Sequence, residues 1–350
     1  MELTTLLQNA VDAKASDIFI IAGQPVSYKI KGSIYPQSSI KVMPDLSAQL
    51  IHAIYAKANR SIDAFLASGD DDFSLTISGL SRFRVNVFRQ RGSMAAVIRI
   101  IMFGLPNYKE LNIPENVMSV SNLTKGLVLL TGPAGSGKTT SLACIIDRIN
   151  TERSNHIITL EDPIEFLHPN KNSIITQREI KTDTQSYLSA LRASLRQAPN
   201  VVLLGEMRDL ETMRTAITAA ETGHLIISTL HTSSAVNTID RIIDTFPSNQ
   251  QQQIRLQLSM VLQSVICQQL VPAAAGGNVP AFEVMHVTPA IRNMIREAKT
   301  HQINSVINAS ASEGMCGMDN SLIQLFSQDK ISRDVALQFS HDPEFIAKKI

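Results

Sequence analysis

The stretch from Gly126 to Thr140, GLVLLTGPAGSGKTT, constrains the fold more than any other part of the sequence. It opens with an apolar run typical of a buried strand, and the residues that follow it have apolar positions at helical spacing. Between them stands G-x-x-x-x-G-K-[ST], the pattern of a loop that binds phosphate between a strand and a helix. The residues predicted to hold a nucleotide are Gly132, Pro133, Ala134, Gly135, Ser136, Gly137, Lys138, Thr139 and Thr140.

Two side chains of this loop have predicted chemical roles. Lys138 can reach the β- and γ-phosphates of ATP, and the Thr139 hydroxyl can ligate Mg²⁺. Glycines let backbone N–H groups face the phosphates, and the helix N-terminus adds partial positive charge. A chance glycine-rich turn is the alternative, and the filled pattern with both flanks argues against it. The sequence therefore predicts a site for ATP and Mg²⁺.

Composition and charge narrow the classes of protein to consider. The 350 residues are enough for about two domains, and the formal net charge of +1 gives no electrostatic reason to expect nucleic-acid binding. The three cysteines, Cys144, Cys267 and Cys316, are widely spaced, which fits a reducing compartment. The N-terminus lacks a basic segment followed by an apolar core, and no apolar run is long enough to span a bilayer. We expect a soluble, cytoplasmic protein.

The pattern predicts two domains, 1–102 and 116–350, joined by a linker at 103–115 that is rich in proline and polar residues. In the first domain we expect a helix from Leu3, a strand from Asp17, a long helix capped by Asp45 and running past Leu66, and a polar turn at 70–72. The three strands of an antiparallel meander should follow at 73–77, 81–90 and 94–101.

From Gly126 onwards, apolar strands alternate with helices, which is typical of an α/β fold with a parallel sheet. The predicted strands are 127–131, 157–160, 201–204 and 225–229, and the predicted helices are 138–150, 184–197, 209–221 and 235–245. Beyond Asn249 we expect a mostly helical C-terminal extension, interrupted by a surface loop at 272–280.

Acidic side chains follow the second of these strands, in ITLEDPIEF at 158–166. Ligands bind at the carboxyl ends of strands in open α/β sheets, so Glu161 or Glu165 could hold Mg²⁺-bound water or orient an attacking water. A helix cap followed by a proline turn explains the same residues equally well. Both interpretations stay open at this point.

The third strand, in VVLLGEMRD, ends in Gly205 and Glu206. P-loop ATPases place an acid here to activate water or hold Mg²⁺, so Glu206 is the candidate catalytic base. His224 and His231 bracket the fourth strand, and His231 suits a sensor of the γ-phosphate. Two histidines seven residues apart with no third ligand do not favour a metal site.

Arg84 and Arg99 lie on adjacent predicted strands of the first domain. Guanidinium groups make bidentate contacts with phosphate and act as arginine fingers. The alternative is that each arginine belongs to an ordinary solvated strand face.

Together, GPAGSGKTT, ITLEDPIEF, LLGEMRDLET and TGHLIISTLHT resemble the four sequence boxes of the hexameric secretion and pilus ATPases. Within that family, PAIRNMIREAKTHQI at 289–303 is similar to a motif of the retraction motors of type IV pili. The resemblance covers nearly the whole chain.

The resemblance implies a PAS-like first domain, a RecA-like second domain and a ring of six subunits at the cytoplasmic face of the inner membrane. It implies that Glu206, Glu161 or Glu165, and His231 with His224, serve ATP hydrolysis. Arg84 and Arg99 would be arginine fingers acting across an interface. Hydrolysis would change the angle between the domains across the linker, drive pilin disassembly through a membrane platform protein, and support twitching motility, alone or with a paralogous retraction ATPase.

Three alternatives remain open. A pilus-extension or secretion ATPase would share this fold, although the motif at 289–303 argues against it. A RecA-like nucleic-acid motor is opposed by the near-neutral charge and the lack of an aromatic-rich basic channel. A non-hydrolysing regulatory partner is the weakest alternative, because every catalytic box is filled.

Overall fold

The computed structural model describes residues 2–30, 32–101 and 104–350. The chain forms two compact units, Met1–Gly104 with Glu165–Leu167, and Leu105–Ile164 with His168–Ile350. We call them the N-terminal unit and the α/β unit and describe each by itself. Within these described ranges, no helix has the length and apolar character needed to cross a membrane.

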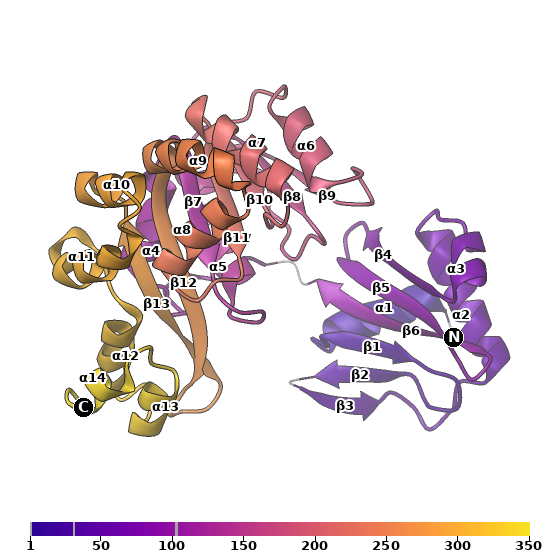
Figure 1. The fold of residues 1–350 in the computed structure, drawn as a ribbon. Helices are drawn as coiled ribbons and strands as arrows, with labels where there is room; N and C mark the ends of the chain where they lie inside the picture. The colour runs from indigo at the N-terminus through magenta and orange to yellow at the C-terminus, as the bar shows by residue number, and fades with distance from the viewer. Residues whose placement is uncertain (1, 31, 102–103) are drawn as a thin grey trace. The chain divides into compact units, whose positions relative to one another are not determined.

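The N-terminal unit is a six-stranded antiparallel sheet in the order β3-β2-β1-β6-β5-β4, packed against helices (Figure 1). Its strands are β1 (Asp17–Ile20), β2 (Ser27–Ile30), β3 (Ser33–Pro36), β4 (Asp70–Ile77), β5 (Ser81–Gln90) and β6 (Ser93–Ile101). Its helices are α1 (Leu3–Asp12), α2 (Pro44–Lys57) and α3 (Asp63–Ser68).

Alternation along β5 separates the two faces of this sheet. Phe83, Val85 and Val87 are fully buried in the core beneath the helices. Arg84, one position out of phase, therefore lies on the other face, because successive side chains of a strand point to opposite sides. The predicted meander of three strands is confirmed, and its second strand carries the predicted pattern.

Three local predictions in this unit were wrong. The long helix is interrupted after Lys57, where Asn59 adopts a left-handed φ of 51°, so α2 and α3 are separate. Asp45 lies in the first turn of α2 instead of capping it, since Met43 is the N-cap. The predicted polar turn at 70–72 is the start of β4, because backbone pairing with β5 outweighs the low strand preference of three aspartates.

The α/β unit is built on a seven-stranded sheet in the order β13-β12-β7-β11-β10-β8-β9. Six strands run parallel and β13 is antiparallel to β12. The strands are β7 (Gly126–Thr131), β8 (His156–Glu161), β9 (Ile174–Glu179), β10 (Val201–Leu204), β11 (Leu225–Leu230), β12 (Leu262–Pro272) and β13 (Asn278–His286).

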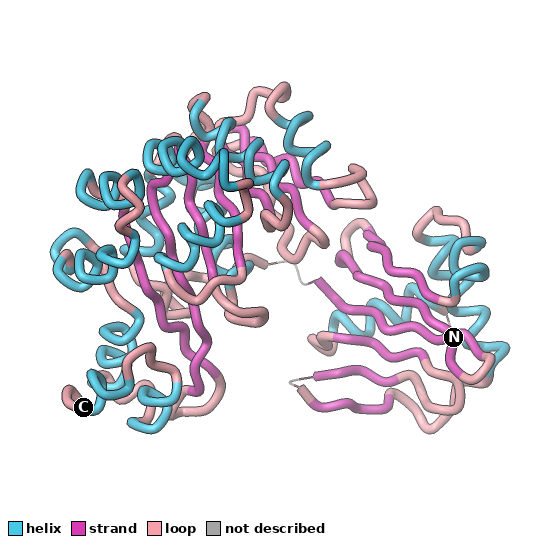
Figure 2. The backbone as a smooth tube through the Cα atoms, in the orientation of Figure 1, coloured by secondary structure: helices cyan, strands magenta, loops and turns pink. Residues whose placement is uncertain are grey.

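Helices flank this sheet, and the C-terminal part of the chain is helical (Figure 2). They are α4 (Glu115–Met118), α5 (Lys138–Glu152), α6 (Tyr187–Ser194), α7 (Leu210–Glu221), α8 (Ala235–Asp244), α9 (Ser248–Val261), α10 (Pro289–Arg296), α11 (Ile303–Ala309), α12 (Met318–Ser327), α13 (Arg333–Gln338) and α14 (Pro343–Ala347). The four predicted strands and the helices that follow them are confirmed, with shifted ends.

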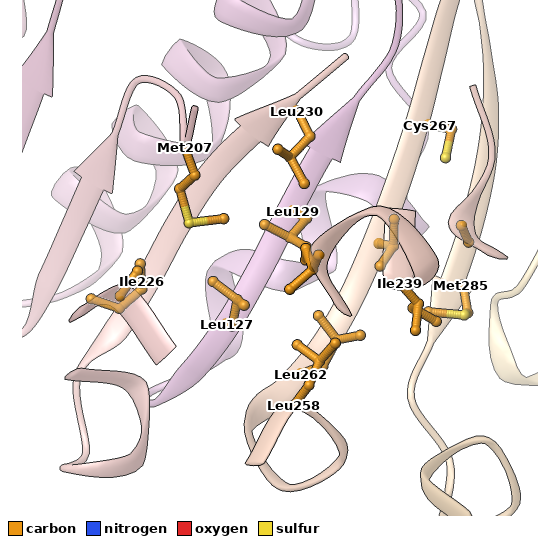
Figure 3. Close-up of a cluster of buried hydrophobic side chains, with 14 of the residues drawn as sticks. Leu127, Leu129, Met207, Ile226, Leu230, Ile239, Leu258, Leu262, Cys267 and Met285 are labelled. Atoms are coloured by element: carbon orange, nitrogen blue, oxygen red, sulfur yellow. The ribbon is translucent and has the colours of Figure 1, made fainter. Parts of the chain in front are cut away.

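Both faces of the central strands are buried. On β7, Leu127 and Leu129 belong to the core shared with α6 to α10, where Leu258 and Leu262 join them (Figure 3). Val128, between them in the sequence, belongs to a separate core beneath α5. This two-sided burial explains why the strands are continuous apolar runs.

The prediction of a mostly helical region after Asn249 was wrong in part, because β12 and β13 form a long hairpin there. The loop predicted at 272–280 is the turn of this hairpin, with strand residues at both ends. The edge strand β9 was also missed. Phe103 of the predicted linker lies outside the described residues, and residues 105–114 pack on the α/β unit through Tyr108, Leu111 and Ile113.

Candidate active site

The loop between β7 and α5 has the backbone shape of a phosphate cradle. Gly132, Gly135 and Gly137 have φ values of 140°, 76° and 86°, which residues with a side chain rarely adopt. α5 begins at Lys138, so its unpaired backbone N–H groups face the loop. A polyphosphate placed here would meet both the loop amides and the positive end of a helix.

The P-loop lysine is folded onto its own loop. Lys138 Nζ donates hydrogen bonds to the carbonyl oxygens of Gly132 at 2.7 Å and Pro133 at 2.8 Å, and the residue is 8% exposed. Its charge is therefore already inside the cradle. A phosphate oxygen would be an ionic acceptor for this ammonium group, and charge-assisted hydrogen bonds are stronger than those to carbonyls.

Gln268 of β12 supports the loop from behind, a role that the sequence did not indicate. Its backbone oxygen would lie 2.2 Å from a Cβ built on Gly132, so glycine alone fits there. Its side-chain oxygen accepts a hydrogen bond of 2.8 Å from Ser141. Among the described residues, the buried Ser136 hydroxyl has no hydrogen-bond partner, as expected of a group that awaits a ligand oxygen.

A cavity of about 270 Å³ opens beside the loop on the side of α5. It is large enough for part of a nucleoside, and its lining is mostly apolar with a few polar groups. Residues that line it include Leu111, Ile113, Gly137, Thr140, Gln268 and Leu270.

The parallel pairing of β8, β10 and β11 brings three predicted residues to the same edge of the sheet. Glu161 ends β8, Glu206 follows β10 by two residues, and His231 follows β11 directly. Because the carboxyl ends of neighbouring parallel strands share an edge, these side chains gather beside the P-loop, which follows β7.

Glu206 lies between a guanidinium and an imidazole. Its Oε1 lies 2.6 Å from Nη2 of Arg208, and its Oε2 lies 3.5 Å from Nε2 of His231. The Glu206 side chain is 15% exposed, whereas Arg208 is 77% exposed. The carboxylate raises the pKa of Arg208. The structure therefore brings together Glu206 and His231, as predicted, and adds Arg208, which stands in the same GEMRD segment but received no role from the sequence.

Gly205 is explained by a close approach of Tyr187. A Cβ built on Gly205 would lie 2.8 Å from the Tyr187 hydroxyl. Burial raises the pKa of this phenol, and the negative charges of Glu206, Asp162 and Glu161 raise it further. The neutral phenol is thus the fourth member of an acidic group at the strand ends. No sequence signal singled out Tyr187, because its helix lies outside every motif.

The two candidate acids after β8 differ in environment. Glu161 is 8% exposed, and its Oε1 accepts a hydrogen bond of 2.6 Å from the Thr159 hydroxyl. Glu165 is exposed and groups with the N-terminal unit. Within the described part of the chain, no three His, Cys, Asp or Glu side chains could by themselves hold a metal ion. Mg²⁺ would therefore need phosphate oxygens as further ligands.

The structure does not bring His224 to this edge. It precedes β11, whose six residues separate it from His231 by about 23 Å at the usual rise of a strand. Its Nδ1 lies 3.1 Å from the Ala219 carbonyl and 3.2 Å from the Thr222 hydroxyl.

In the N-terminal unit, Arg84 and Arg99 are directly opposed residues of β5 and β6. Arg84 Nη2 lies 2.6 Å from Asp72, and Arg99 Nε lies 3.0 Å from the buried Asp17. The two predicted arginine fingers therefore lie side by side on the face of the sheet opposite to the helices.

These features define a P-loop nucleotide site at the carboxyl edge of a mostly parallel sheet. The chain belongs to the family described as "Type II/IV secretion system protein", which matches residues 2–317. It is an ATPase of this family with an N-terminal antiparallel-sheet domain and a mixed, mostly parallel α/β domain with C-terminal helices.

Individual relatives are similar over almost their full length. The chain is 43% identical to the type IV pilus retraction ATPase PilT of Pseudomonas aeruginosa, over 98% of this chain and 99% of the relative. It is 37% identical to the type IV pilus ATPase PilU of the same organism, over 96% and 88%. A crystal structure of the pilus retraction motor PilT with bound ADP matches with a TM-score of 0.92, 42% identity and 99% coverage of both chains.

Proposed function

We propose that this chain is the ATP-hydrolysing motor that retracts a type IV pilus. The observation that carries the proposal is the similarity to PilT across both units, including the ADP-bound motor with a TM-score of 0.92. The motif at 289–303 forms α10 and the segment after it, so it belongs to the ordered C-terminal part of the α/β unit.

In this proposal, the loop from Gly132 to Thr140 binds the phosphates of ATP. Lys138 exchanges its two carbonyl acceptors for phosphate oxygens, and the Thr139 hydroxyl helps to hold Mg²⁺. Mg²⁺ supplies charge neutralisation between the phosphates when it is bound. Glu161 supports the ion or its water from the end of β8, and Glu165 is the alternative acid.

Glu206 is the proposed catalytic base, and His231 beside it senses the terminal phosphate. A carboxylate that is mostly excluded from water and fixed by two partners is oriented before the substrate arrives. His224 stays among the proposed catalytic residues only because it belongs to the same sequence box as His231. Arg84 and Arg99 would act as arginine fingers on a neighbouring subunit's nucleotide.

The finer assignments belong to the same proposal. The N-terminal unit is PAS-like and the α/β unit RecA-like, with boundaries at 1–102, 103–115 and 116–350. Six copies would form a ring at the cytoplasmic face of the inner membrane, working on a platform protein, alone or with a paralogous retraction ATPase. Motion across the linker would transmit hydrolysis to the platform. No nucleic acid is expected to take part.

The direct test is Glu206→Gln, which keeps the shape of the side chain but removes its basicity. We expect ATP binding within about twofold of wild type and a fall in kcat of about 10³-fold, within the range for losing a general base. Retained turnover would refute the assignment. In the organism of origin, deletion should abolish twitching and increase surface pili, whereas loss of pili would indicate an extension motor instead.

A further inference from the structure

A buried carboxylate lies outside the chemistry described so far. Glu283 of β13 is 4% exposed, and Cys267, its partner across the pair on β12, is 1% exposed. Figure 3 labels Cys267, a residue of β12, among the buried side chains. Burying a carboxylate is costly unless hydrogen bonds satisfy it, so its contacts indicate what it does.

Glu283 accepts a hydrogen bond at the start of α8. Its Oε1 accepts a bond of 2.7 Å from the backbone N–H of Ala235, the first residue of α8. Burial raises the pKa of this carboxyl, and the hydrogen bond from Ala235 opposes the rise. Helix N-termini stabilise negative charge, so the carboxylate suits its place at the start of α8.

α8 begins immediately after the loop that carries His231. The loop runs from His231 to Ser234, and the backbone N–H held by Glu283 is that of the next residue. Thr238, one turn into α8, bonds to the Thr232 hydroxyl at 2.7 Å and to the Ser234 carbonyl at 2.7 Å. The loop is thus short and tied to the first turn of α8.

Cys267 fixes the same carboxylate oxygen from the other side. Its thiol lies 3.7 Å from Oε1 of Glu283 and accepts a hydrogen bond of 3.0 Å from the Thr131 hydroxyl. Thr131 is the residue before Gly132, the first glycine of the phosphate loop. A buried polar chain therefore runs from the end of β7 to the start of α8.

We propose that Glu283 is a positioning residue for ATP hydrolysis, which holds the loop of His231 at the distance from Glu206 that turnover needs. The inference rests on the proposed function, in which His231 and Glu206 act on the terminal phosphate. Glu283 touches neither substrate nor His231 and acts through the start of α8.

The first test is Glu283→Gln in the full-length protein, with steady-state ATPase kinetics. The amide keeps one acceptor oxygen but removes the negative charge that the N-terminus of α8 stabilises. We expect kcat to fall about tenfold with KM for ATP within twofold of wild type. Glu313→Gln, the same change at an exposed C-terminal glutamate, should leave both constants within twofold. An unchanged kcat in a folded Glu283→Gln protein would overturn the proposal.

The second test asks whether Glu283 acts through His231. If it does, Glu283→Gln should lower kcat no further in a His231→Ala background, because residues acting as a unit are not additive. If the losses in kcat from the two substitutions multiply in the double variant, Glu283 does not act through His231. The proposed function would then still stand. Unchanged kcat in His231→Ala alone would instead contradict the proposed role of His231, and the route with it.

Cys267 provides a variant in case Glu283→Gln does not fold, as judged by circular dichroism and the thermal midpoint. Cys267→Ala removes the contact to the carboxylate oxygen and should lower kcat about threefold. Cys267→Ser keeps a donor and an acceptor at the same position and should restore wild-type kcat. Equal kcat in Cys267→Ala and Cys267→Ser would count against the proposal.

Discussion

The catalytic edge of the α/β unit and the arginine pair of the N-terminal unit hold their charges in opposite ways. Glu206 is 15% exposed and is fixed by Arg208 and His231 of its own edge. Arg84 and Arg99 are 40% and 67% exposed, and each forms an ion pair with an aspartate. The catalytic edge holds its carboxylate away from water in a fixed orientation, whereas the arginine pair of the N-terminal unit stays hydrated.

This difference separates two tasks. A desolvated carboxylate needs no reorganisation when a nucleotide arrives, which favours catalysis. Both arginines are exposed, so each can exchange its aspartate for a phosphate, and Arg84 loses less by this because Asp72 is itself exposed whereas Asp17 is buried. We therefore expect the catalytic edge to be fixed in advance and the arginines to be exchangeable.

The largest expected effect comes from removing the exchangeable charges. Arg84→Ala and Arg99→Ala should each lower kcat by about 10³-fold if they are arginine fingers, with nucleotide affinity nearly unchanged. ATPase assays and binding of a fluorescent ADP analogue measure the two quantities. Arg60→Ala breaks a similar pair with Asp71 in the same unit and serves as the control. Wild-type turnover in both Arg84→Ala and Arg99→Ala would contradict the catalytic role proposed for the two arginines.

Removing the aspartates that pair with the two arginines should lower the free energy of unfolding by different amounts. Asp17 is 8% exposed at its side chain and Asp72 is 42% exposed. We expect Asp17→Ala to lower the free energy of unfolding by about 2 kcal/mol, because Arg99 loses a sheltered partner. Asp72→Ala should cost less than about 1 kcal/mol, as for an exposed ion pair. Urea titrations of both variants give the values, and equal costs would contradict this ranking.

Acid should act mainly on the α/β unit. Burial lowers the pKa of His168 to about 4, with Lys171 lowering it further and Asp147 opposing. The unfolded chain binds this proton near pH 6.5 and the folded chain does not, so stability is lost as pH falls from about 6.5 towards 4. Between pH 7.5 and 5.0, wild type should lose about 2 kcal/mol more than His168→Gln. The N-terminal unit has one histidine in the sequence, the exposed His52. Equal losses in the two proteins would refute the assignment.

The smallest effect tests whether Arg208 helps to fix Glu206. Arg208→Ala should lower kcat about fivefold, since His231 still holds the other carboxylate oxygen, and a loss of about 1 kcal/mol is typical of one exposed ionic contact. Arg192→Ala, which breaks an exposed pair with Glu211, should leave kcat unchanged. A much larger loss in Arg208→Ala would indicate that this arginine contacts the nucleotide itself.

The parts of this fold that depend on short sequence patterns were predicted from the sequence. The P-loop, the strands before Glu206 and His231, and the alternation of β5 around Val85 follow from patterns within ten residues. Parallel strand ends share an edge by topology, so the meeting of Glu206 and His231 also followed from the sequence.

Other features depend on contacts between distant segments. β12 contains polar residues such as Gln268, whose burial depends on the P-loop beside it, so no alternation identified a strand there. Tyr187 and Gly205 touch across 18 positions of sequence, and neither residue type alone indicates the contact. Arg208 stood inside a quoted motif, but only the folded loop shows that its guanidinium returns to Glu206.

The direct opposition of Arg84 and Arg99 has a consequence for how such a motor could be timed. Opposed residues of paired strands lie about 5 Å apart at their Cβ atoms, and the hydrogen-bonded sheet keeps this spacing while it moves. When the sheet moves, Arg84 and Arg99 can therefore approach or leave a nucleotide only together. A subunit stimulated by this pair would receive both positive charges or neither, so its activation would be all-or-none and not graded.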